Sequence, residues 1–173
     1  CGGTASVLFE AYNLNTWRIA VFGAGHVAQA LVRVLMGLEC HVTCIDPRRE
    51  WLEKLPQSSQ LNILEREHPE NEVATLADDA YVLSMTMGHA TDRPILDAIF
   101  RSGQCFPYLG VIGSQAKRKV LIHELRQAGI DPRLAESFRC PIGLRLGTNQ
   151  PGEIAVSIAA ELIQVRDATR KSD

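Results

Sequence analysis

Short apolar runs alternate with amphipathic stretches along most of the chain. The runs at residues 18–22, 41–45, 81–85 and 108–112 are rich in β-branched and aromatic side chains and are flanked by turn-forming residues, a pattern typical of strands. Between them, residues 26–38, 94–101 and 115–128 carry apolar side chains at helical spacing, and Gly103 and Gly129 follow the last two as C-terminal stops. Strands and helices therefore alternate.

This alternation predicts one α/β domain, a Rossmann-like doubly wound parallel sheet over residues 15–173, with ligands at the carboxyl ends of the strands. A further strand is predicted at 61–64, and the charged stretch 65–72 is interpreted as a solvated loop or short helix. The last helix should begin near Pro151 and run to about Val165, so that residues 166–173 fray.

The first residues do not fit this domain. Residues 1–10 (CGGTASVLFE) resemble a strand, but a single strand ahead of a complete β-α-β unit has no obvious place in the sheet. We therefore assign residues 1–14 to a remnant of an upstream domain or to a linker. The first residue is Cys1 rather than Met, which favours a truncated product over the alternative of a mature lipoprotein.

Composition and charge exclude several classes of protein. With 18 basic and 20 acidic residues, a net charge of -2, the chain has no bias toward nucleic acid or an anionic membrane. No apolar run approaches the roughly 18 residues of a membrane-spanning helix, so we expect a soluble protein. Five cysteines without C-x-x-C spacing indicate the reducing cytoplasm. Cys40 and Cys44 would lie roughly 13 Å apart on a strand, too far to share a zinc ion, and are predicted to be buried.

The strongest functional signal is the glycine-rich turn at residues 23–28 (GAGHVA), which follows a strand directly and opens a helix. Gly23 permits the tight turn, and Gly25 lets backbone N–H groups approach a pyrophosphate at the positive end of the helix dipole. His26 could donate to a phosphate oxygen or contact a substrate; the alternative is a surface histidine without a role.

Asp46 closes the second strand 23 residues after Gly23, where a carboxylate can accept both hydroxyls of an adenosine ribose. This position favours NAD over NADP, although Arg48 and Arg49 follow and could neutralise a 2′-phosphate. The alternative role for Asp46 is an N-cap for the segment after Pro47. No acid or base for hydride transfer is evident in the sequence.

Three further clusters follow predicted strands or helices. Residues 86–92 and 110–114 end strands on the ligand side of the sheet. In the second cluster, Gly113 and Ser114 are predicted to form another anion-binding site, reinforced by the basic side chains of Lys117, Arg118 and Lys119. The alternative is that Ser114 only caps a helix whose basic face is solvated. Cys140 lies between loop-forming residues, and is either an exposed thiol whose pKa Arg139 lowers or a buried structural cysteine.

Taken together, GAGHVA, the strand-end Asp46, GVIGS with its basic run, CPIGL and PGEIAVSIAAEL resemble the xanthine dehydrogenase accessory factor family of the XdhC type, over residues 18–165. Cys1-Gly2-Gly3 resembles that family's Cys-Gly-Gly. The resemblance implies a chaperone that binds the molybdenum cofactor (molybdopterin), supports its sulfuration by a cysteine desulfurase, and delivers it to xanthine dehydrogenase or a related molybdenum hydroxylase. A homodimer is expected.

The resemblance also implies a site. Cys1 and Cys140 are the candidate soft ligands to molybdenum. The full set of expected cofactor-binding residues is Gly23, Gly25, His26, Val27, Asp46, Arg48, His89, Gly113, Ser114, Cys1 and Cys140. A departure from the family pattern at Met87-Gly88 argues against a metal at His89. The alternatives are an NAD(P)-dependent oxidoreductase of unknown substrate and a redox-sensing NAD-binding module.

Overall fold

The structure, a computed structural model, describes residues 17–170. Its strands are β1 (Trp17–Phe22), β2 (Cys40–Asp46), β3 (Leu61–Glu65), β4 (Tyr81–Ser84) and β5 (Tyr108–Val111). Its helices are α1 (His26–Leu35), α2 (Arg49–Leu52), α3 (His89–Ser102), α4 (Gln115–Gln127), α5 (Pro132–Ala135) and α6 (Pro151–Arg170), and a 3-10 helix, η1, spans Pro69–Thr75. The segment assigned to an upstream remnant, residues 1–14, lies outside the described residues.

The strands form one parallel sheet in the order β3-β2-β1-β4-β5, so the predicted doubly wound α/β fold is confirmed. The first two crossovers place β2 and β3 on one side of β1, and the next places β4 on its other side. The switch point between β1 and β4 is where open α/β sheets form ligand-binding crevices. Among the described residues, no helix is both long and apolar enough to cross a membrane.

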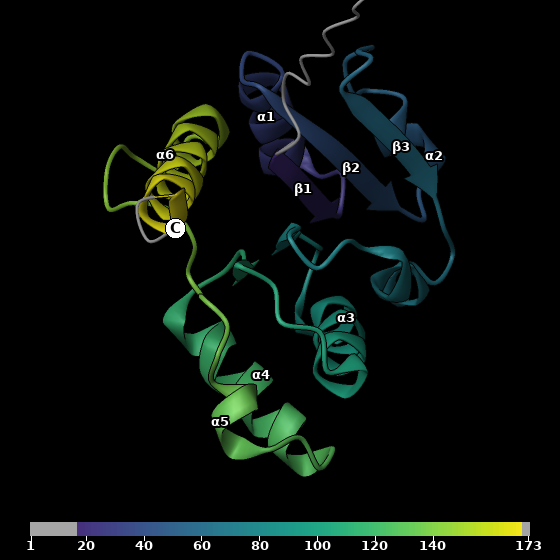
Figure 1. Cartoon of the computed structure of the whole chain (residues 1–173), viewed down its shortest axis with the longest axis vertical. Coiled ribbons are helices and arrows are strands. Elements are labelled where there is room, and N and C mark those ends of the chain that lie inside the picture. The colour runs from purple at the N-terminus through teal and green to yellow at the C-terminus, as the bar shows by residue number, and fades with distance from the viewer. Residues whose placement is uncertain (1–16, 171–173) are drawn as a thin grey trace, which may run out of the picture.

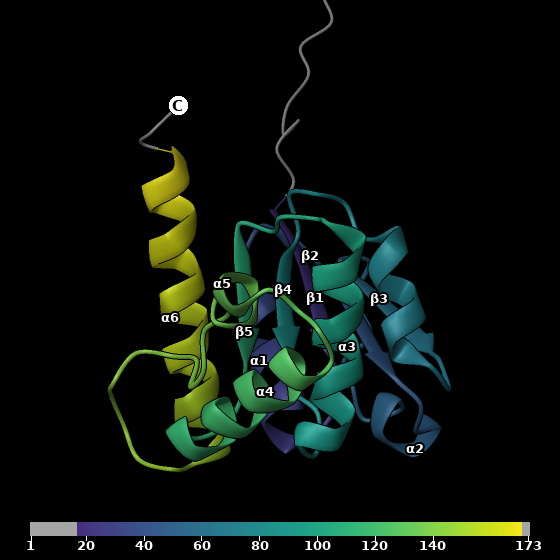
Figure 2. The ribbon, with the colours of Figure 1, turned by 90° about the horizontal axis from the view of Figure 1, so that it is seen from below.

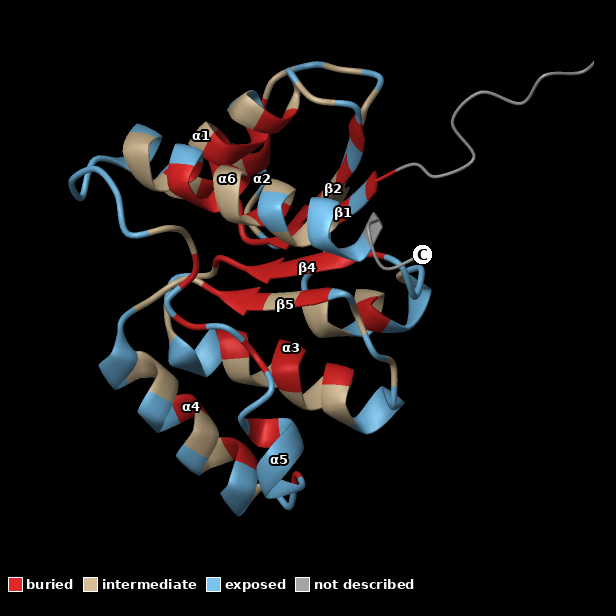
Figure 3. Cartoon of the chain, turned by 60° about the vertical axis from the view of Figure 1, so that its left-hand side comes forward, coloured by how far each residue is buried: buried red, intermediate tan, exposed pale blue. Residues whose placement is uncertain are grey.

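Helices cover both faces of the sheet (Figures 1 and 2). Because side chains alternate along a strand, Ile19 and Val21 pack in a core with α1 and α6, whereas Ala20 and Phe22 pack on the opposite face with residues of α3. α1 and α6 also pack against each other. All four residues of β4 are buried (Figure 3), as expected for a central strand of a parallel sheet that is covered on both faces.

Two helix boundaries differ from the sequence prediction. α1 ends at Leu35 instead of residue 38, and the chain turns through Met36 and Gly37. α3 begins at His89 rather than Pro94, because the extended Gly88 and the Thr91 hydroxyl start the helix upstream. Pro94 is tolerated inside it because the carbonyl that loses its N–H partner belongs to the exposed Ala90, where water can bond it.

The last helix is also longer than predicted. The sequence predicts fraying after Val165, yet α6 continues to Arg170. The Arg166 guanidinium lies 4.7 Å from the centre of the Trp17 ring at the amino end of β1. The Thr169 hydroxyl bonds the Val165 carbonyl at 3.0 Å. These contacts fix the polar end of the helix, which hydrophobic periodicity alone could not indicate.

Candidate functional site

The glycine-rich turn lies at the switch point of the sheet. The Gly23 N–H donates to the Ile45 carbonyl of β2 at 2.7 Å, and its φ of 104° is in the region that favours glycine. A Cβ at Gly23 would lie 2.5 Å from the Met85 carbonyl oxygen just after β4. Glycine is therefore required for β1, β2 and the end of β4 to approach this closely.

Gly25 has the opposite surroundings. It is the N-cap residue of α1, with an ordinary φ of -65°, and a Cβ there would meet no atom within 4 Å. No side chain caps α1, and its first turn contains no acidic residue. The N–H groups of His26 and Val27 have no acceptor among residues 17–170. The head of α1 is thus a positive helix end facing open space, the arrangement that binds phosphate.

Asp46, expected to receive a ribose, is already occupied by protein donors. Its side chain is buried, and its Oδ2 accepts from the Ala24 N–H and from Arg48 Nη2, both at 2.7 Å. Its Oδ1 accepts from the Arg48 backbone N–H at 2.8 Å and from Arg48 Nε at 2.9 Å. Burial works to raise the pKa of Asp46, but the Arg48 and Ala24 hydrogen bonds outweigh it and hold the pKa below its usual range. Asp46 also does not cap α2, whose N-cap is Arg48.

The two arginines after Asp46 lie in different surroundings. Arg48 is about a quarter exposed, donates from Nη1 to the Met87 sulfur and lies 5.0 Å from the centre of the Trp51 ring. Arg49 is exposed and pairs with Glu53, the residue that follows α2. The His26 ring packs edge-on against the same Trp51 ring, with centroids 4.9 Å apart. Of the two arginines, Arg48 is the one placed beside the glycine turn.

A cavity of about 260 Å³ adjoins these residues. Gly23, Asp46 and Arg48 form one wall, and Thr86, Met87 and the first turns of α3 form another. Apolar side chains make up most of the lining, and two carboxylates, Glu67 and Glu70, also contribute. The cavity therefore suits a ligand with an apolar surface next to a charged group.

Behind the cavity, a buried polar cluster joins the ends of β4 and β5. The Asp92 side chain is fully buried and accepts from the Ser84 hydroxyl at 2.6 Å and the Thr86 hydroxyl at 2.8 Å. Lys117 Nζ lies 2.5 Å from Asp92 Oδ2 and also donates to the Ile112 carbonyl. Asp92 and Lys117 belong to separate sequence motifs, and no local signal indicates that they form a pair.

The anion cradle predicted at Gly113 and Ser114 is largely filled by the protein itself. Ser114 caps α4 by accepting from the Lys117 N–H at 3.2 Å. The Lys117 ammonium forms an ion pair with Asp92, and the Arg118 side chain donates to the Glu136 carbonyl. A Cβ at Gly113 would overlap the Lys117 side chain. The arrangement corresponds to the alternative of a helix cap, with Lys119 left on the exposed face.

Cys140 is buried, which corresponds to the alternative of a structural cysteine and not to that of an exposed thiol. Its Sγ lies 3.6 Å from the Ser114 carbonyl, and burial is the main cause that raises its pKa. Arg139 does not activate it, because its guanidinium pairs with Glu161 on α6. No group of three His, Cys, Asp or Glu side chains suited to a metal ion occurs within residues 17–170. Cys1 lies outside the described residues.

His89, at the start of α3, does not line the cavity. Its exposed ring is 3.8 Å from a Glu124 oxygen on α4. The glycine turn thus brings together Gly23, Gly25, His26, Val27, Asp46 and Arg48. In contrast, Gly113, Ser114 and Cys140 lie on the β5–α4 side and do not line the cavity. The sequence assigned Thr86, Met87 and Asp92 only to the cluster at residues 86–92, and Lys117 only to the basic run beside Ser114.

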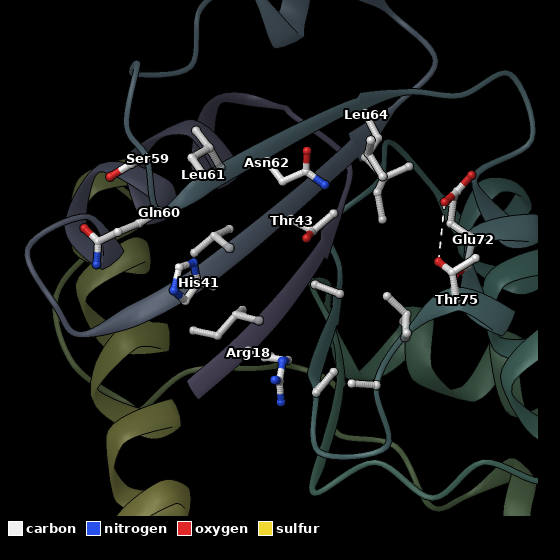
Figure 4. A pocket seen from close by; sticks show the side chains of 17 residues that line it. Arg18, His41, Thr43, Ser59, Gln60, Leu61, Asn62, Leu64, Glu72 and Thr75 are labelled. Carbon is white, nitrogen blue, oxygen red and sulfur yellow. Dashed lines mark hydrogen bonds between the residues drawn. The ribbon is translucent and has the colours of Figure 1, made fainter. Parts of the chain in front are cut away.

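A larger hollow, of about 600 Å³, lies elsewhere, on the face of β1, β2 and β3 opposite α1 (Figure 4). It exists because the crossover from β3 to β4 contains only the short η1. Its charged side chains already have partners: Arg18 pairs with Asp79, and Glu72 with Arg66. Because it lies along the strands and away from their carboxyl ends, we place the candidate site at the glycine turn instead.

Comparisons with known proteins identify similar chains. The "Uncharacterized protein YqeB" of Escherichia coli K12 is 30% identical over 169 residues, covering 96% of this chain and 30% of that protein. A protein of Bacillus subtilis described as a probable xanthine dehydrogenase subunit is 32% identical over 151 residues, covering 86% of this chain and 43% of that protein. This chain therefore spans less than half the length of either relative.

A crystal structure of a xanthine dehydrogenase from Bacillus halodurans superposes with a TM-score of 0.72 at 25% identity, covering 88% of this chain and 43% of that one. The family described as the XdhC Rossmann domain matches residues 19–162, which include most of the sheet, the glycine turn and most of α6. The chain therefore belongs to the XdhC family and carries its Rossmann domain.

Proposed function

We propose that this domain belongs to an accessory factor for xanthine dehydrogenase or a related molybdenum hydroxylase, and that it holds the molybdenum cofactor during maturation. The observation that carries the proposal is the uncapped head of α1, open above Gly25 and free of acidic residues in its first turn. The names of the Bacillus relatives support a partner of the xanthine dehydrogenase kind.

The described residues fit one end of such a cofactor. Molybdopterin carries a terminal phosphate, and the N–H groups of His26 and Val27 would hold it at the head of α1. The cavity beside Arg48 is lined mainly by apolar side chains and would take the flat pterin. The cofactor supplies the molybdenum; the protein's part is to bind the phosphate and to shield the ring from water.

The residues at the glycine turn and in the cavity do not include a cysteine that could bind molybdenum. Cys140 is buried under the Ser114 carbonyl, on the β5 side of the site. Of the two candidate thiolate ligands, Cys1 therefore remains, and it lies outside the described residues. Sulfuration by a cysteine desulfurase and delivery to the client enzyme remain parts of the proposal that need the partner proteins.

The decisive experiment is retention of the cofactor. The purified chain is mixed with free molybdenum cofactor and passed over a gel-filtration column, and the pterin that elutes with protein is oxidised and measured by fluorescence. We expect about stoichiometric retention by the native chain and at least a tenfold loss in Gly25→Val, because the valine fills the space where phosphate approaches.

Gly152→Val is the matched control, since Gly152 in α6 also has no atom within 4 Å of a Cβ and lies far from the glycine turn in the sequence. It should retain the cofactor like the native chain. Equal retention by Gly25→Val, with circular dichroism showing both variants folded, would contradict the proposed phosphate site.

A further inference from the structure

The carboxylate of Asp46 has no free position for a ligand. An ionised carboxylate offers about four lone-pair sites. Four protein donors reach it: the backbone N–H groups of Ala24 and Arg48, and Nε and Nη2 of the Arg48 side chain. A ribose that binds through its two hydroxyls needs two of those sites, so it could enter only by displacing part of Arg48.

Arg48 is held in place from several sides. Besides its bonds to Asp46, its Nη1 contacts the Met87 sulfur and its guanidinium lies over the Trp51 ring. Trp51 is in turn packed by the His26 ring and by the Lys54 ammonium, 4.3 Å from the ring centre. A displaced Arg48 would leave the charge of Asp46 buried and unpaired, a costly state.

The same side chain faces the ligand cavity. Three of the five N–H groups of the guanidinium have the partners described above, and the other two have none among residues 17–170. Arg48 lines the 260 Å³ cavity together with Gly23 and Thr86. It can therefore donate to a phosphate oxygen without releasing Asp46.

We propose that Arg48 is the specificity-determining residue of this site: it withholds Asp46 from a ribose diol and offers its own charge to a phosphate-bearing group. The site thus takes a ligand with a phosphate near Arg48 and rejects one that must bind by an unphosphorylated adenosine ribose, such as NAD. The inference rests on the proposed function only in placing the ligand at the head of α1.

NAD and NADP are suitable probes because they differ only in a 2′-phosphate. Their dissociation constants are measured by isothermal titration calorimetry on the native chain, Arg48→Gln, Arg48→Lys and Arg49→Gln. We expect the native chain to bind NADP at least about tenfold more tightly than NAD. Arg48→Gln should bind NAD at least about tenfold more tightly than the native chain does, because it frees lone pairs on Asp46.

Arg49→Gln is the matched control, because it removes the same charge at the next residue, where the arginine is exposed and pairs with Glu53. It should keep the native preference for NADP over NAD. Arg48→Lys keeps the charge but lacks the planar fork that forms two parallel bonds to Asp46. Its gain in NAD affinity should therefore be smaller than that of Arg48→Gln. If the native chain binds neither nucleotide measurably, the gain of NAD binding in Arg48→Gln still decides the question.

Equal or tighter binding of NAD by the native chain would overturn the inference, as would a gain in Arg49→Gln equal to that in Arg48→Gln. Failure here is distinguishable from failure of the proposed function. A chain that retains the molybdenum cofactor, but gains no NAD binding in Arg48→Gln, contradicts the role of Arg48 alone. A gain of NAD binding without cofactor retention contradicts the proposed function alone.

Discussion

Lys117 on α4 forms an ion pair with Asp92 on α3, with 2.5 Å between Nζ and Oδ2, and so links the two helices that follow β4 and β5. The Asp92 side chain has no exposed surface and that of Lys117 is 17% exposed. Two hydroxyls, of Ser84 and Thr86, donate to the other carboxylate oxygen. The pair fixes the first turn of α3, which forms one wall of the candidate site.

Lys117→Met should therefore lower the free energy of unfolding by about 3 kcal/mol, because it leaves the Asp92 charge buried without its cation. Urea denaturation followed by circular dichroism measures the change. Arg49→Met, which breaks the exposed pair with Glu53, should change the free energy of unfolding by less than about 0.5 kcal/mol. Similar small effects for both variants would mean that the Lys117–Asp92 pair does not stabilise the fold.

The two glycines of the turn should respond differently to alanine. Gly23→Ala should destabilise the protein by about 3 kcal/mol, since the methyl group would lie 2.5 Å from the Met85 carbonyl oxygen at a positive φ. Gly25→Ala has an ordinary φ and open space, so thermal unfolding should show a change of about 1 kcal/mol or less. Equal destabilisation by the two substitutions would refute the geometry described for the turn.

The cysteines should differ in reactivity. Cys105 is exposed, whereas Cys40, Cys44 and Cys140 are buried, and burial raises the pKa of Cys40 to about 11 and that of Cys44 to about 12. Iodoacetamide should modify Cys105 in the native protein and reach the other three only after denaturation. Peptide mass mapping assigns each site separately. Alkylation of Cys140 at a rate near that of Cys105 would restore the exposed-thiol interpretation.

The stability contributed by Asp46 should depend on pH. Because its folded pKa is lowered, its stabilising effect is fully present above the unfolded pKa of about 3.9 and is lost as the pH falls through the folded pKa. Asp46→Asn should therefore be less stable than the native chain by about 2 kcal/mol at neutral pH, and the difference should shrink below about pH 4.

Urea denaturation across that pH range makes the measurement. Asp79→Asn is the control, because it removes an exposed carboxylate paired with Arg18 and should change stability by less than about 0.5 kcal/mol at neutral pH. A destabilisation by Asp46→Asn that stays constant to low pH would show that the charge of Asp46 is not what stabilises the turn.

The sequence by itself determined the architecture. Short apolar runs rich in β-branched and aromatic residues predict buried parallel strands. A glycine turn between a strand and a helix predicts which edge of the sheet binds the ligand. Both signals are local: a strand, a tight turn and a helix start depend on residues a few positions apart. For the same reason Gly23 and Gly25 could be assigned separate roles before their surroundings were known.

Only the tertiary structure decided which charges are available to a ligand. The sequence predicts that Asp46 accepts a ribose, but in the structure its carboxylate bonds Arg48 and the Ala24 N–H. It predicts that Lys117 belongs to a basic anion-binding site, but in the structure Lys117 pairs with Asp92. Cys140, flanked by loop residues, is buried against the start of α4. A buried charge needs a partner, and tertiary packing often supplies it from a residue far away in the sequence. A local sequence pattern therefore does not indicate which residue that partner is.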